Sequence, residues 1–284
     1  IVKAVPFGQA SQHDGRAKEE RDEEDQMMLI NRSAARRYHQ QLMTVMETDP
    51  AVQQFLQERK ISTDTIIQFQ IGLAPDEWRF LTPVIIEKGL YAPAEKLGLV
   101  KTKDDTNYDF FRNRIVTPVC DEGGTIVGFS ARLLPNSKTN KADAGKYINS
   151  RVITDERGEE RGIFHKSKIL FGLNHAGAAI RKKGYAYLVE GNFDVITMHD
   201  RGITNTVAPC GTSLTIRQVK LLKRYCAHVV IMTDGDKAGH DAMMKDVNLF
   251  LQEDFKVEYC QLPDGEDPDS FARNFEPPKE GENI

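Results

Sequence analysis

Residues 185–263 alternate between strand-like and helix-like segments, and this alternation decides the fold. The stretch opens with YAYLVEG (185–191), NFDVITMHDRG (192–202) and TNTVAPCG (204–211). It continues with TIRQVKLLKRY (215–225), HVVIMTDGD (228–236), KAGHDAMMKDVNLFLQ (237–252) and FKVEYCQLP (255–263). Parallel strands need long crossover connections, which helices usually provide. The pattern therefore predicts a parallel sheet with helices on both faces.

Acidic residues follow three of the predicted strands. Glu190 follows YAYLV, Asp234 and Asp236 follow HVVIMT, and the group DGEDPD (264–269) follows the last strand. Ligands of open α/β sheets bind beyond the carboxyl ends of the strands, so we expect these acids to converge. Gathered carboxylates repel one another unless cations neutralise them, and Mg²⁺ prefers oxygen ligands. A lone DGD is typical of a turn, but three such groups predict a divalent-metal site.

The chain before this region is first helical. Apolar residues recur at helical spacing over 27–48, and a second helix is expected over 51–60, capped by Asp49. Ser62 or Thr63 can cap a short third helix. The first hundred residues are therefore expected to be mainly α.

The pattern then changes from helix to strand. Residues 78–99 still favour helix, interrupted at a glycine and at Pro93. The β-rich runs 115–120 and 125–133, joined by the turn signal DEGG, predict a hairpin. Residues 135–161 are rich in Asn, Lys, Asp and Gly, which is typical of a loop that faces ligands.

These signals divide the chain into four parts. Residues 1–26 are dense in charge and are expected to be a linker, disordered or a frayed helix. Residues 27–182 form the α+β subdomain, residues 183–262 the parallel-sheet subdomain, and residues 263–284 an acidic motif and tail. Because the chain begins with Ile, we expect a further domain upstream.

Composition limits the class of protein. The net charge is −4, but residues 101–183 carry 16 basic and 10 acidic side chains, whereas residues 184–284 carry 10 and 17. This division is typical of a polyanion track beside a metal-binding acidic cluster, although solvated faces could also produce it. No run approaches the roughly 20 apolar residues of a membrane span, and no signal peptide is evident. The four cysteines have no zinc-ligand spacing, so we expect a cytoplasmic protein without a zinc site.

The acids also belong to longer motifs. EGNFD (190–194), TDGDKAG (233–239) and DGEDPDS (264–270) resemble the TOPRIM signature shared by primases, topoisomerases and some nucleases. The upstream strings are IGLAP (71–75), FRNRIVTP (111–118), GTIVGFSAR (124–132), KYINS (146–150), IFHKSKILFGL (163–173) and APCGTSLT (208–215). Their order and spacing are similar to those of the DnaG-type primase polymerase domain. The resemblance spans residues 30–275 and departs from the usual EGYMD only at Asn192 and Phe193.

This resemblance implies a role for each motif. It implies a DNA primase, a DNA-directed RNA polymerase that makes RNA primers on single-stranded DNA by two-metal nucleotidyl transfer. The implied catalytic and metal-binding acids are Glu190, Asp234 and Asp236, with Asp267 and Asp269 as further metal ligands and Gly191, Asp194 and Gly235 in support. The implied nucleotide- and template-binding residues are Arg112, Arg114, Arg132, Lys146, Asn149 and Lys166. Mg²⁺ or Mn²⁺ is the implied cofactor.

The resemblance also implies partners. They are the DNA template, ribonucleoside triphosphates, the RNA–DNA hybrid product and, through a region outside these residues, the replicative helicase at a bacterial replication fork. Two alternatives stay open at this point. One is a TOPRIM nuclease or topoisomerase, for which we find no place for a tyrosine nucleophile; the other is an inactive nucleic-acid-binding module.

Overall fold

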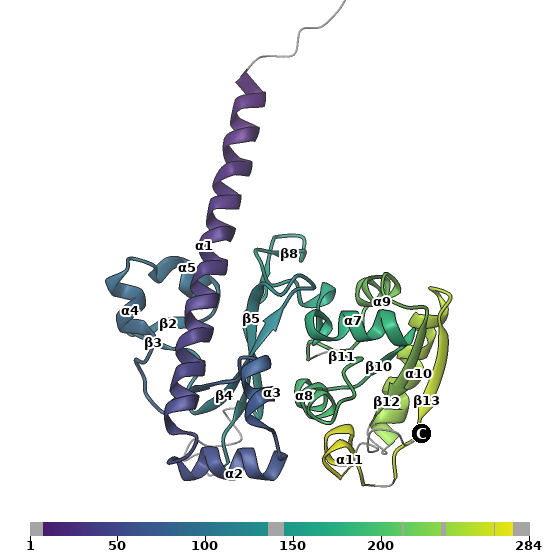
Figure 1. Ribbon diagram of the computed structural model, residues 1–284. Helices are drawn as coiled ribbons and strands as arrows, with labels where there is room; N and C mark the ends of the chain where they lie inside the picture. The colour runs from purple at the N-terminus through teal and green to yellow at the C-terminus, as the bar shows by residue number, and fades with distance from the viewer. Residues whose placement is uncertain (1–7, 136–144, 212, 234–236, 264, 275–284) are drawn as a thin grey trace, which may run out of the picture.

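The chain forms two α/β units that lie side by side (Figure 1). The computed structural model describes residues 8–135, 145–211, 213–233, 237–263 and 265–274. The helices of the N-terminal unit are α1 (Gly8–Val45), α2 (Pro50–Arg59), α3 (Thr63–Gln68), α4 (Thr82–Glu87) and α5 (Tyr91–Lys96). Its strands are β1 (Gly72–Ala74), β2 (Val100–Lys103), β3 (Thr106–Asp109), β4 (Arg114–Cys120), β5 (Ile126–Leu133), β6 (Tyr147–Asn149), β7 (Ile153–Thr154) and β8 (Glu160–Arg161).

The second unit contains the predicted alternation. Its helices are the short 3-10 helix η1 (Lys166–Lys168), α7 (Leu173–Lys183), α8 (Asn192–Asp200), α9 (Ile216–Lys223), α10 (Lys237–Leu251) and α11 (Pro268–Asn274). Its strands are β9 (Leu170–Phe171), β10 (Ala186–Leu188), β11 (Thr206–Pro209), β12 (His228–Met232) and β13 (Lys256–Cys260). The predicted α/β class, an α+β region followed by a mostly parallel sheet, is confirmed.

Helix α1 is longer than the predicted helix over 27–48. It starts at Gly8, so the described part of the expected linker is helical, and in Figure 1 its N-terminal half projects from the body of the molecule. Its C-terminal half packs on the first sheet through Tyr38 and Leu42, both at most 1% exposed. The backbone of Gly72 in β1 lies so close that a Cβ there would come within 2.6 Å of Tyr38 backbone and Cβ atoms.

Two predicted helix starts are confirmed. Asp49 Oδ1 accepts hydrogen bonds from the backbone N–H groups of Ala51 and Val52, at 2.9 and 3.1 Å, and caps α2. Ser62 Oγ caps α3 by accepting from Thr65 N at 3.3 Å. Pro93, expected to interrupt a helix, instead lies in the first turn of α5, where a missing N–H leaves no intrahelical bond unmade.

The first sheet holds the predicted hairpin. Its strand order is β1-β4-β5-β6, and β4 pairs antiparallel with β5, Thr117 opposite Ser130. The region 135–161 is not all loop, because β6 pairs with β5 and β7 pairs with β8. Residues 136–144 lie outside the described part of the chain.

The second sheet has the order β13-β12-β10-β11-β9. Strands β10, β11, β12 and β13 are parallel, as predicted, whereas β9 runs antiparallel to β11 at one edge. Both β9 and the following α7 contribute buried side chains to this sheet's core, including Leu170 and Ile180. The second unit therefore draws on residues before the predicted boundary at 182/183.

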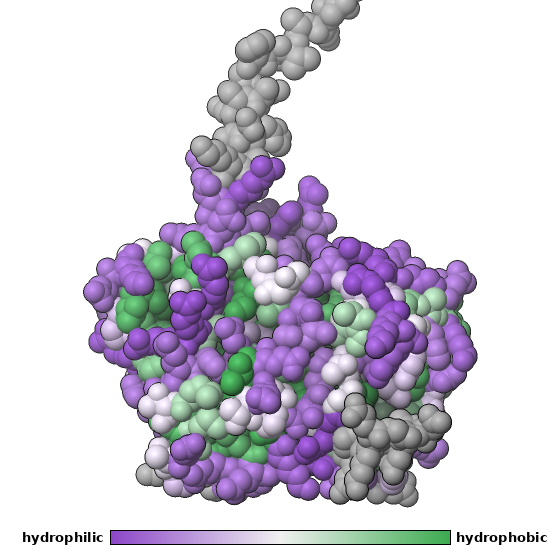
Figure 2. All heavy atoms as spheres, viewed as in Figure 1, coloured by the Kyte–Doolittle hydropathy of each residue, from purple (hydrophilic) through white to green (hydrophobic). Residues whose placement is uncertain are grey.

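One hydrophobic core joins the two units. Phe55 and Phe69 of the first unit belong to the same buried cluster as Phe193 and Ile196 of α8, and the rings of Phe55 and Phe193 meet edge to face at 5.3 Å. Hydrophilic residues cover much of the face in Figure 2, with apolar patches over the N-terminal unit. No helix that the structure describes combines the length and apolar composition needed to cross a membrane.

Candidate active site

The predicted acids follow neighbouring parallel strands. Glu190 lies two residues after β10, Thr233 lies directly after β12, and these strands pair in register, Leu188 opposite Ile231. Residues beyond Leu188 and beyond Met232 therefore leave the sheet at the same edge. Asp234, Gly235 and Asp236 come next after Thr233 but lie outside the described residues, so their convergence with Glu190 stays a prediction.

The turn after β10 presents Glu190 to solvent. Asp194 Oδ2 accepts a hydrogen bond from Gly191 N at 2.8 Å, which closes the first turn of α8. A Cβ on Gly191 would lie 3.1 Å from this same oxygen, so the turn favours glycine. Asp194 thus supports the backbone beside Glu190, whose side chain is exposed.

Negative charge accumulates around Glu190. Burial and the nearby charge of Glu190 raise the pKa of Asp246, on α10, to about 6, with Lys245 opposing the shift. Among the residues that the structure describes, no three Asp, Glu, His or Cys side chains lie close enough to hold an ion by themselves. The possible metal ligands at this edge of the sheet are nevertheless carboxylate oxygens, and the local charge is negative. Such ligands suit a hard divalent cation.

The two acids of the DPD motif have different surroundings. Asp267 caps α11: its Oδ1 accepts from Ser270 N at 2.6 Å. Asp269 is 4% exposed; its Oδ2 lies 2.6 Å from Arg59 Nη1, and its Oδ1 accepts from Thr197 Oγ1 at 2.6 Å. Asp267 lines the cavity, and its second carboxylate oxygen makes no hydrogen bond to the described residues, whereas both oxygens of Asp269 are engaged.

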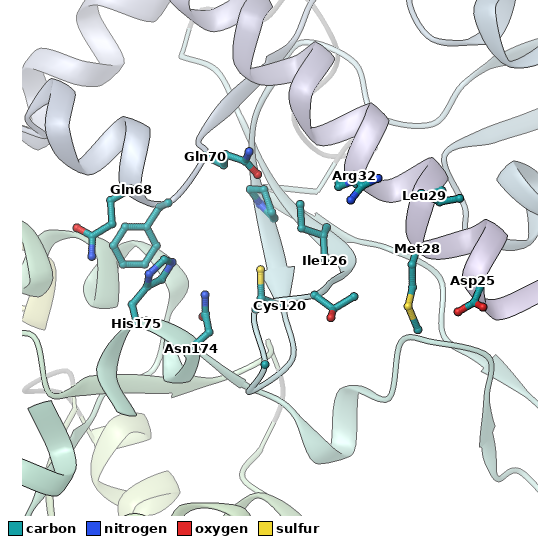
Figure 3. A pocket seen from close by; sticks show the side chains of 15 residues that line it. Asp25, Met28, Leu29, Arg32, Gln68, Gln70, Cys120, Ile126, Asn174 and His175 are labelled. Carbon is teal, nitrogen blue, oxygen red and sulfur yellow. The ribbon is translucent and has the colours of Figure 1, made fainter. Parts of the chain in front are cut away.

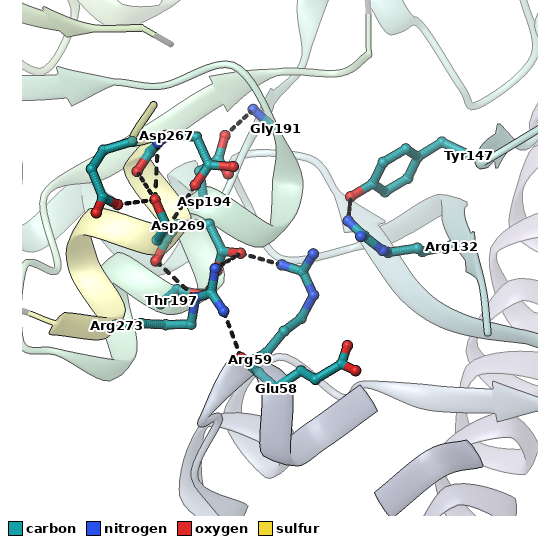
Figure 4. A network of polar contacts seen from close by, with 12 residues as sticks. Glu58, Arg59, Arg132, Tyr147, Gly191, Asp194, Thr197, Asp267, Asp269 and Arg273 are labelled. Atoms are coloured by element: carbon teal, nitrogen blue, oxygen red, sulfur yellow. Dashed lines mark hydrogen bonds and ion pairs between the residues drawn. The ribbon is translucent and has the colours of Figure 1, made fainter. Parts of the chain in front are cut away.

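A cavity of about 640 Å³ brings acidic and basic residues together between the two units. Its acidic wall includes Glu190, Asp194 and Asp267, and its opposite wall is formed by strands β5 and β6. Figure 4 shows the two walls, with Arg132 donating a hydrogen bond to the hydroxyl of Tyr147. The predicted residues that line the cavity are Gly191, Glu190, Asp194, Asp267, Asp269, Arg132, Lys146 and Asn149.

Lys166 lies at the margin of this cavity. Its Nζ is 3.5 Å from the carbonyl oxygen of Gly211, which itself lines the cavity. Gly211 has φ +73°, and a Cβ there would come within 2.8 Å of Asn149 Nδ2. A glycine at this point therefore lets Asn149 and Lys166 approach the strand end.

Besides Lys166, two predicted basic residues lie outside the cavity lining. Arg114 is 4% exposed and donates to the carbonyl oxygens of Gly145 and Lys146 at 3.1 and 3.5 Å; burial lowers its pKa. Arg112 stacks on Trp78, with its guanidinium carbon 3.3 Å from the ring centroid. Arg114 thus supports the backbone that carries Lys146, and Arg112 belongs to a separate surface.

Three residues near the candidate site or on an exposed surface were not predicted from the sequence. Arg59 reaches the cavity from the end of α2, Trp78 is 63% exposed beneath Arg112, and Asp246 lies near Glu190. Trp78 follows IGLAP by three residues and lies in the polar stretch DEWR (76–79), a signal that is visible in the sequence. Arg59 and Asp246 carry no local signal, because each acquires its surroundings only through folding.

A second groove, of about 760 Å³, opens between α1, the β4–β5 turn and α7 (Figure 3). Amide and imidazole side chains, including Gln68, Gln70, Asn174 and His175, point toward it. None of the predicted site residues is among the described residues that line this groove. We therefore place the candidate active site in the 640 Å³ cavity.

Two family models match the chain. The model of the DNA primase catalytic core, N-terminal domain, matches residues 37–177, and the Toprim-like model matches residues 187–272. The DNA primase of Halalkalibacterium halodurans is 37% identical over 261 residues, which cover 91% of this chain and 41% of that protein. The chain thus spans about two fifths of this relative's length.

Solved structures agree with the family models. A structure of the Aquifex aeolicus primase, containing its zinc-binding and RNA polymerase domains, has a TM-score of 0.77 and 31% identity, covering 89% of this chain and 59% of that one. The DnaG primase catalytic domain bound to single-stranded DNA has a TM-score of 0.73 and 30% identity, covering 89% of this chain and 75% of that one. The predicted resemblance is confirmed: this chain belongs to the DnaG family of DNA primases and corresponds to their catalytic core, including the Toprim domain.

Proposed function

We propose that this chain polymerises ribonucleoside triphosphates into short RNA primers on single-stranded DNA. The observation that carries the proposal is the cavity in which Glu190 and Asp194 face Arg132 and Lys146. A nucleotidyl transferase needs carboxylates for metal on one side and cations for phosphates on the other. The DnaG catalytic domain solved with single-stranded DNA supports the choice of template.

The Toprim domain implies divalent metal, and we propose Mg²⁺ or Mn²⁺. Glu190, Asp234 and Asp236 would hold the ions, with Asp267 at the margin of the set. When bound, the metal lowers the barrier to attack by a primer 3′ hydroxyl and neutralises charge on the pyrophosphate that leaves. The hydrogen bond from Gly191 N to Asp194 fixes the turn that presents Glu190.

The opposite wall would bind the incoming nucleotide. Arg132 offers a planar guanidinium that can make paired hydrogen bonds to phosphate, while Lys146 and Lys166 supply mobile point charges. Asn149 can donate or accept at a base or sugar edge. Arg114 would act indirectly, by fixing the carbonyl groups on either side of the Lys146 amide.

We propose that the template also contacts the surface formed by Trp78, Arg112 and Tyr108. Arg112 covers one face of the exposed Trp78 ring, and the Trp78 and Tyr108 rings form a T-shaped pair with centroids 5.6 Å apart. Stacked aromatic and guanidinium groups bind unpaired bases with little sequence preference. This surface belongs to the N-terminal unit, so the template would run across that unit into the cavity.

The remaining partners follow from primer synthesis. The product would be an RNA–DNA hybrid made at a bacterial replication fork, in the cytoplasm. Contact with the replicative helicase would be made by a region outside these residues, and zinc would have no site in this chain.

De novo RNA synthesis on single-stranded DNA tests the proposal. We expect labelled short RNA from the unmodified chain with Mg²⁺ or Mn²⁺, and none from Glu190→Gln or Asp236→Ala. The matched control is Glu258→Gln, an exposed carboxylate on β13 that pairs with Lys256. Synthesis by Glu190→Gln at the rate of the control would refute its role, and DNA cleavage instead of RNA synthesis would favour the nuclease alternative.

A further inference from the structure

Two side chains at the N-terminus of α9, those of Thr215 and Gln218, hold the turn that carries Lys166. Gln218 is 1% exposed, and its Nε2 donates to the carbonyl oxygens of Lys166 at 3.2 Å and of Ile169 at 2.8 Å. Thr215 Oγ1 donates to the carbonyl oxygen of Ser167 at 2.6 Å. Three carbonyl groups of this turn and its C-cap are therefore bound by side chains of a different element.

The turn η1 has little internal support. It is a 3-10 helix of three residues, closed by a hydrogen bond from Lys168 N to His165 O at 2.9 Å. Turns of this kind have poorer hydrogen-bond geometry than an α-helix. On another side of the turn, the carboxylate of Glu160, on β8, accepts from Ser167 N at 3.1 Å. Contacts from α9 and β8 therefore fix the backbone of Lys166.

Capping of α9 does not by itself require glutamine at position 218. Gln218 Oε1 accepts from Thr215 N at 2.9 Å, and Thr215 Oγ1 accepts from Gln218 N at 3.2 Å, which forms a capping box. A glutamate at this position can make the same bond to Thr215 N. An amide has two N–H groups as well, and Gln218 donates to two carbonyl oxygens with them. Glutamine therefore serves the Lys166 turn in addition to the cap.

The segment before α9 reaches the candidate active site. Gly211, between β11 and α9, lines the 640 Å³ cavity, and its carbonyl oxygen lies 3.5 Å from Lys166 Nζ. A lysine has a flexible four-carbon stem, so the position of its backbone decides which part of the cavity margin its charge can reach. Gln218 is not among the described residues that line this cavity. Its route to a bound ligand is through the backbone of Lys166.

We propose that Gln218 is a positioning residue that directs Lys166 toward the triphosphate of the incoming nucleotide. The proposal rests on the proposed function, which places that nucleotide against the basic wall of the cavity. Loss of the two donated hydrogen bonds would leave carbonyl groups without partners and release the turn. The ammonium group of Lys166 would then occupy positions away from the phosphates, which weakens binding although no charge has been removed.

Isothermal titration calorimetry of the full chain with ATP and Mg²⁺ tests the proposal without requiring catalysis. Gln218→Glu keeps the acceptor for the cap but has no N–H to donate, and it is expected to weaken ATP binding about ten-fold. Gln218→Met, which adds no charge, should have the same effect. Lys166→Ala is expected to weaken binding by at least as much.

A double-mutant cycle separates positioning from general damage to the fold. ATP binding by Gln218→Met/Lys166→Ala should lie within about two-fold of that of Lys166→Ala, because the glutamine acts through the lysine. Additive losses would overturn the proposal, and so would unchanged affinity in Gln218→Met or in Lys166→Ala. The expected binding pattern in a chain that makes no RNA would refute the proposed function alone. RNA synthesis with additive losses would refute the positioning role alone.

Asn205→Asp is the matched control. Asn205 is 0% exposed; its Oδ1 accepts from Lys183 Nζ at 3.0 Å, and its Nδ2 donates to Tyr185 O at 3.2 Å. It precedes β11 whereas Gly211 follows it, so it lies at the opposite end of this strand from the cavity. This change also removes a buried donor to a backbone carbonyl, and it should leave ATP affinity within about two-fold of the unmodified chain.

A milder pair of variants tests the same turn if the Gln218 variants do not fold. Thr215→Val removes the hydroxyl that donates to the Ser167 carbonyl oxygen, and it is expected to weaken ATP binding about three-fold or more. Thr215→Ser keeps the hydroxyl and should bind as the unmodified chain does. Equal ATP affinities of the two Thr215 variants would overturn the proposal.

Discussion

At the scale of single residues, His199 makes stability depend on pH. It is 6% exposed, and its Nε2 donates to the carbonyl oxygen of Thr206 at 3.0 Å. Burial lowers its pKa to about 4, the nearby charge of His175 acts in the same direction, and the hydrogen bond opposes both. The unfolded chain, with an ordinary histidine pKa of about 6.5, therefore binds a proton first as the pH falls.

We expect this histidine to destabilise the fold between about pH 6.5 and pH 4, by up to about 3 kcal/mol at the lower end. Its effect is absent above pH 7, where both states are neutral. Urea denaturation across this range should show a steeper loss of stability in the unmodified chain than in His199→Gln, which keeps a donor for Thr206. Parallel curves for the two proteins would contradict the assignment.

Trp78 is the only tryptophan of the chain, so its role in template binding can be measured directly. Stacking of a base on the exposed ring should quench its fluorescence when single-stranded DNA is added. Trp78→Ala is expected to weaken binding of labelled DNA by about 1–3 kcal/mol in an anisotropy assay. Tyr259→Ala, which removes an exposed aromatic ring from edge strand β13, should leave the affinity unchanged.

Individual residues also show what a sequence can and cannot predict. Asp49 and Ser62 were predictable as caps because a capping side chain bonds to N–H groups two or three residues ahead. Asp269 was not, because Arg59 lies 210 residues away and meets it only after both units fold. The motif resemblance suggested metal binding at Asp269, while its contacts favour an arginine partner.

At the scale of elements, the packing of α1 on β1 depends on Gly72. A Cβ there would come within 2.6 Å of Tyr38 backbone and side-chain carbons, which cannot move without shifting α1. We expect Gly72→Ala to lower the free energy of unfolding by about 1–3 kcal/mol, measured by urea denaturation. Gly89→Ala, at φ +65° with no atom within 4 Å, should cost only about 1 kcal/mol of backbone strain. Equal losses would show that the contact is unimportant.

Helices and strands were predicted correctly where the sequence pattern is local and extends over many residues. The strand and helix alternation over 185–263 appears in the structure in full order, and so does the β4–β5 hairpin. The two-residue strand β9 was not predictable, because pairing with β11 rather than its own sequence makes it a strand. The same holds for β6, which becomes a strand through its pairing with β5.

At the scale of the whole molecule, the shared core predicts that both units unfold together. Phe55 and Phe69 pack in one cluster with Phe193 and Ile196, so neither unit can lose its packing alone. We expect one urea transition, with the same midpoint from Trp78 fluorescence in the first unit and from labelling of the buried Cys210 thiol in the second. Separated midpoints would show that the units are independent.

The strand order has a consequence for how the active site can change. Strand β10 lies at the centre of its sheet, and the amides on either side of Leu188 donate to the carbonyls of Asn205 and Val207 at 3.0 Å. Their hydrogens should exchange with solvent only when the protein unfolds globally, whereas β6 is an edge strand paired on one side alone. Glu190 therefore follows a strand whose amide hydrogens exchange slowly. Lys146 directly precedes β6 and Asn149 lies in it, and β6 can open locally. Adaptation to different nucleotides would then take place on the basic wall, while the carboxylate that follows β10 keeps its position.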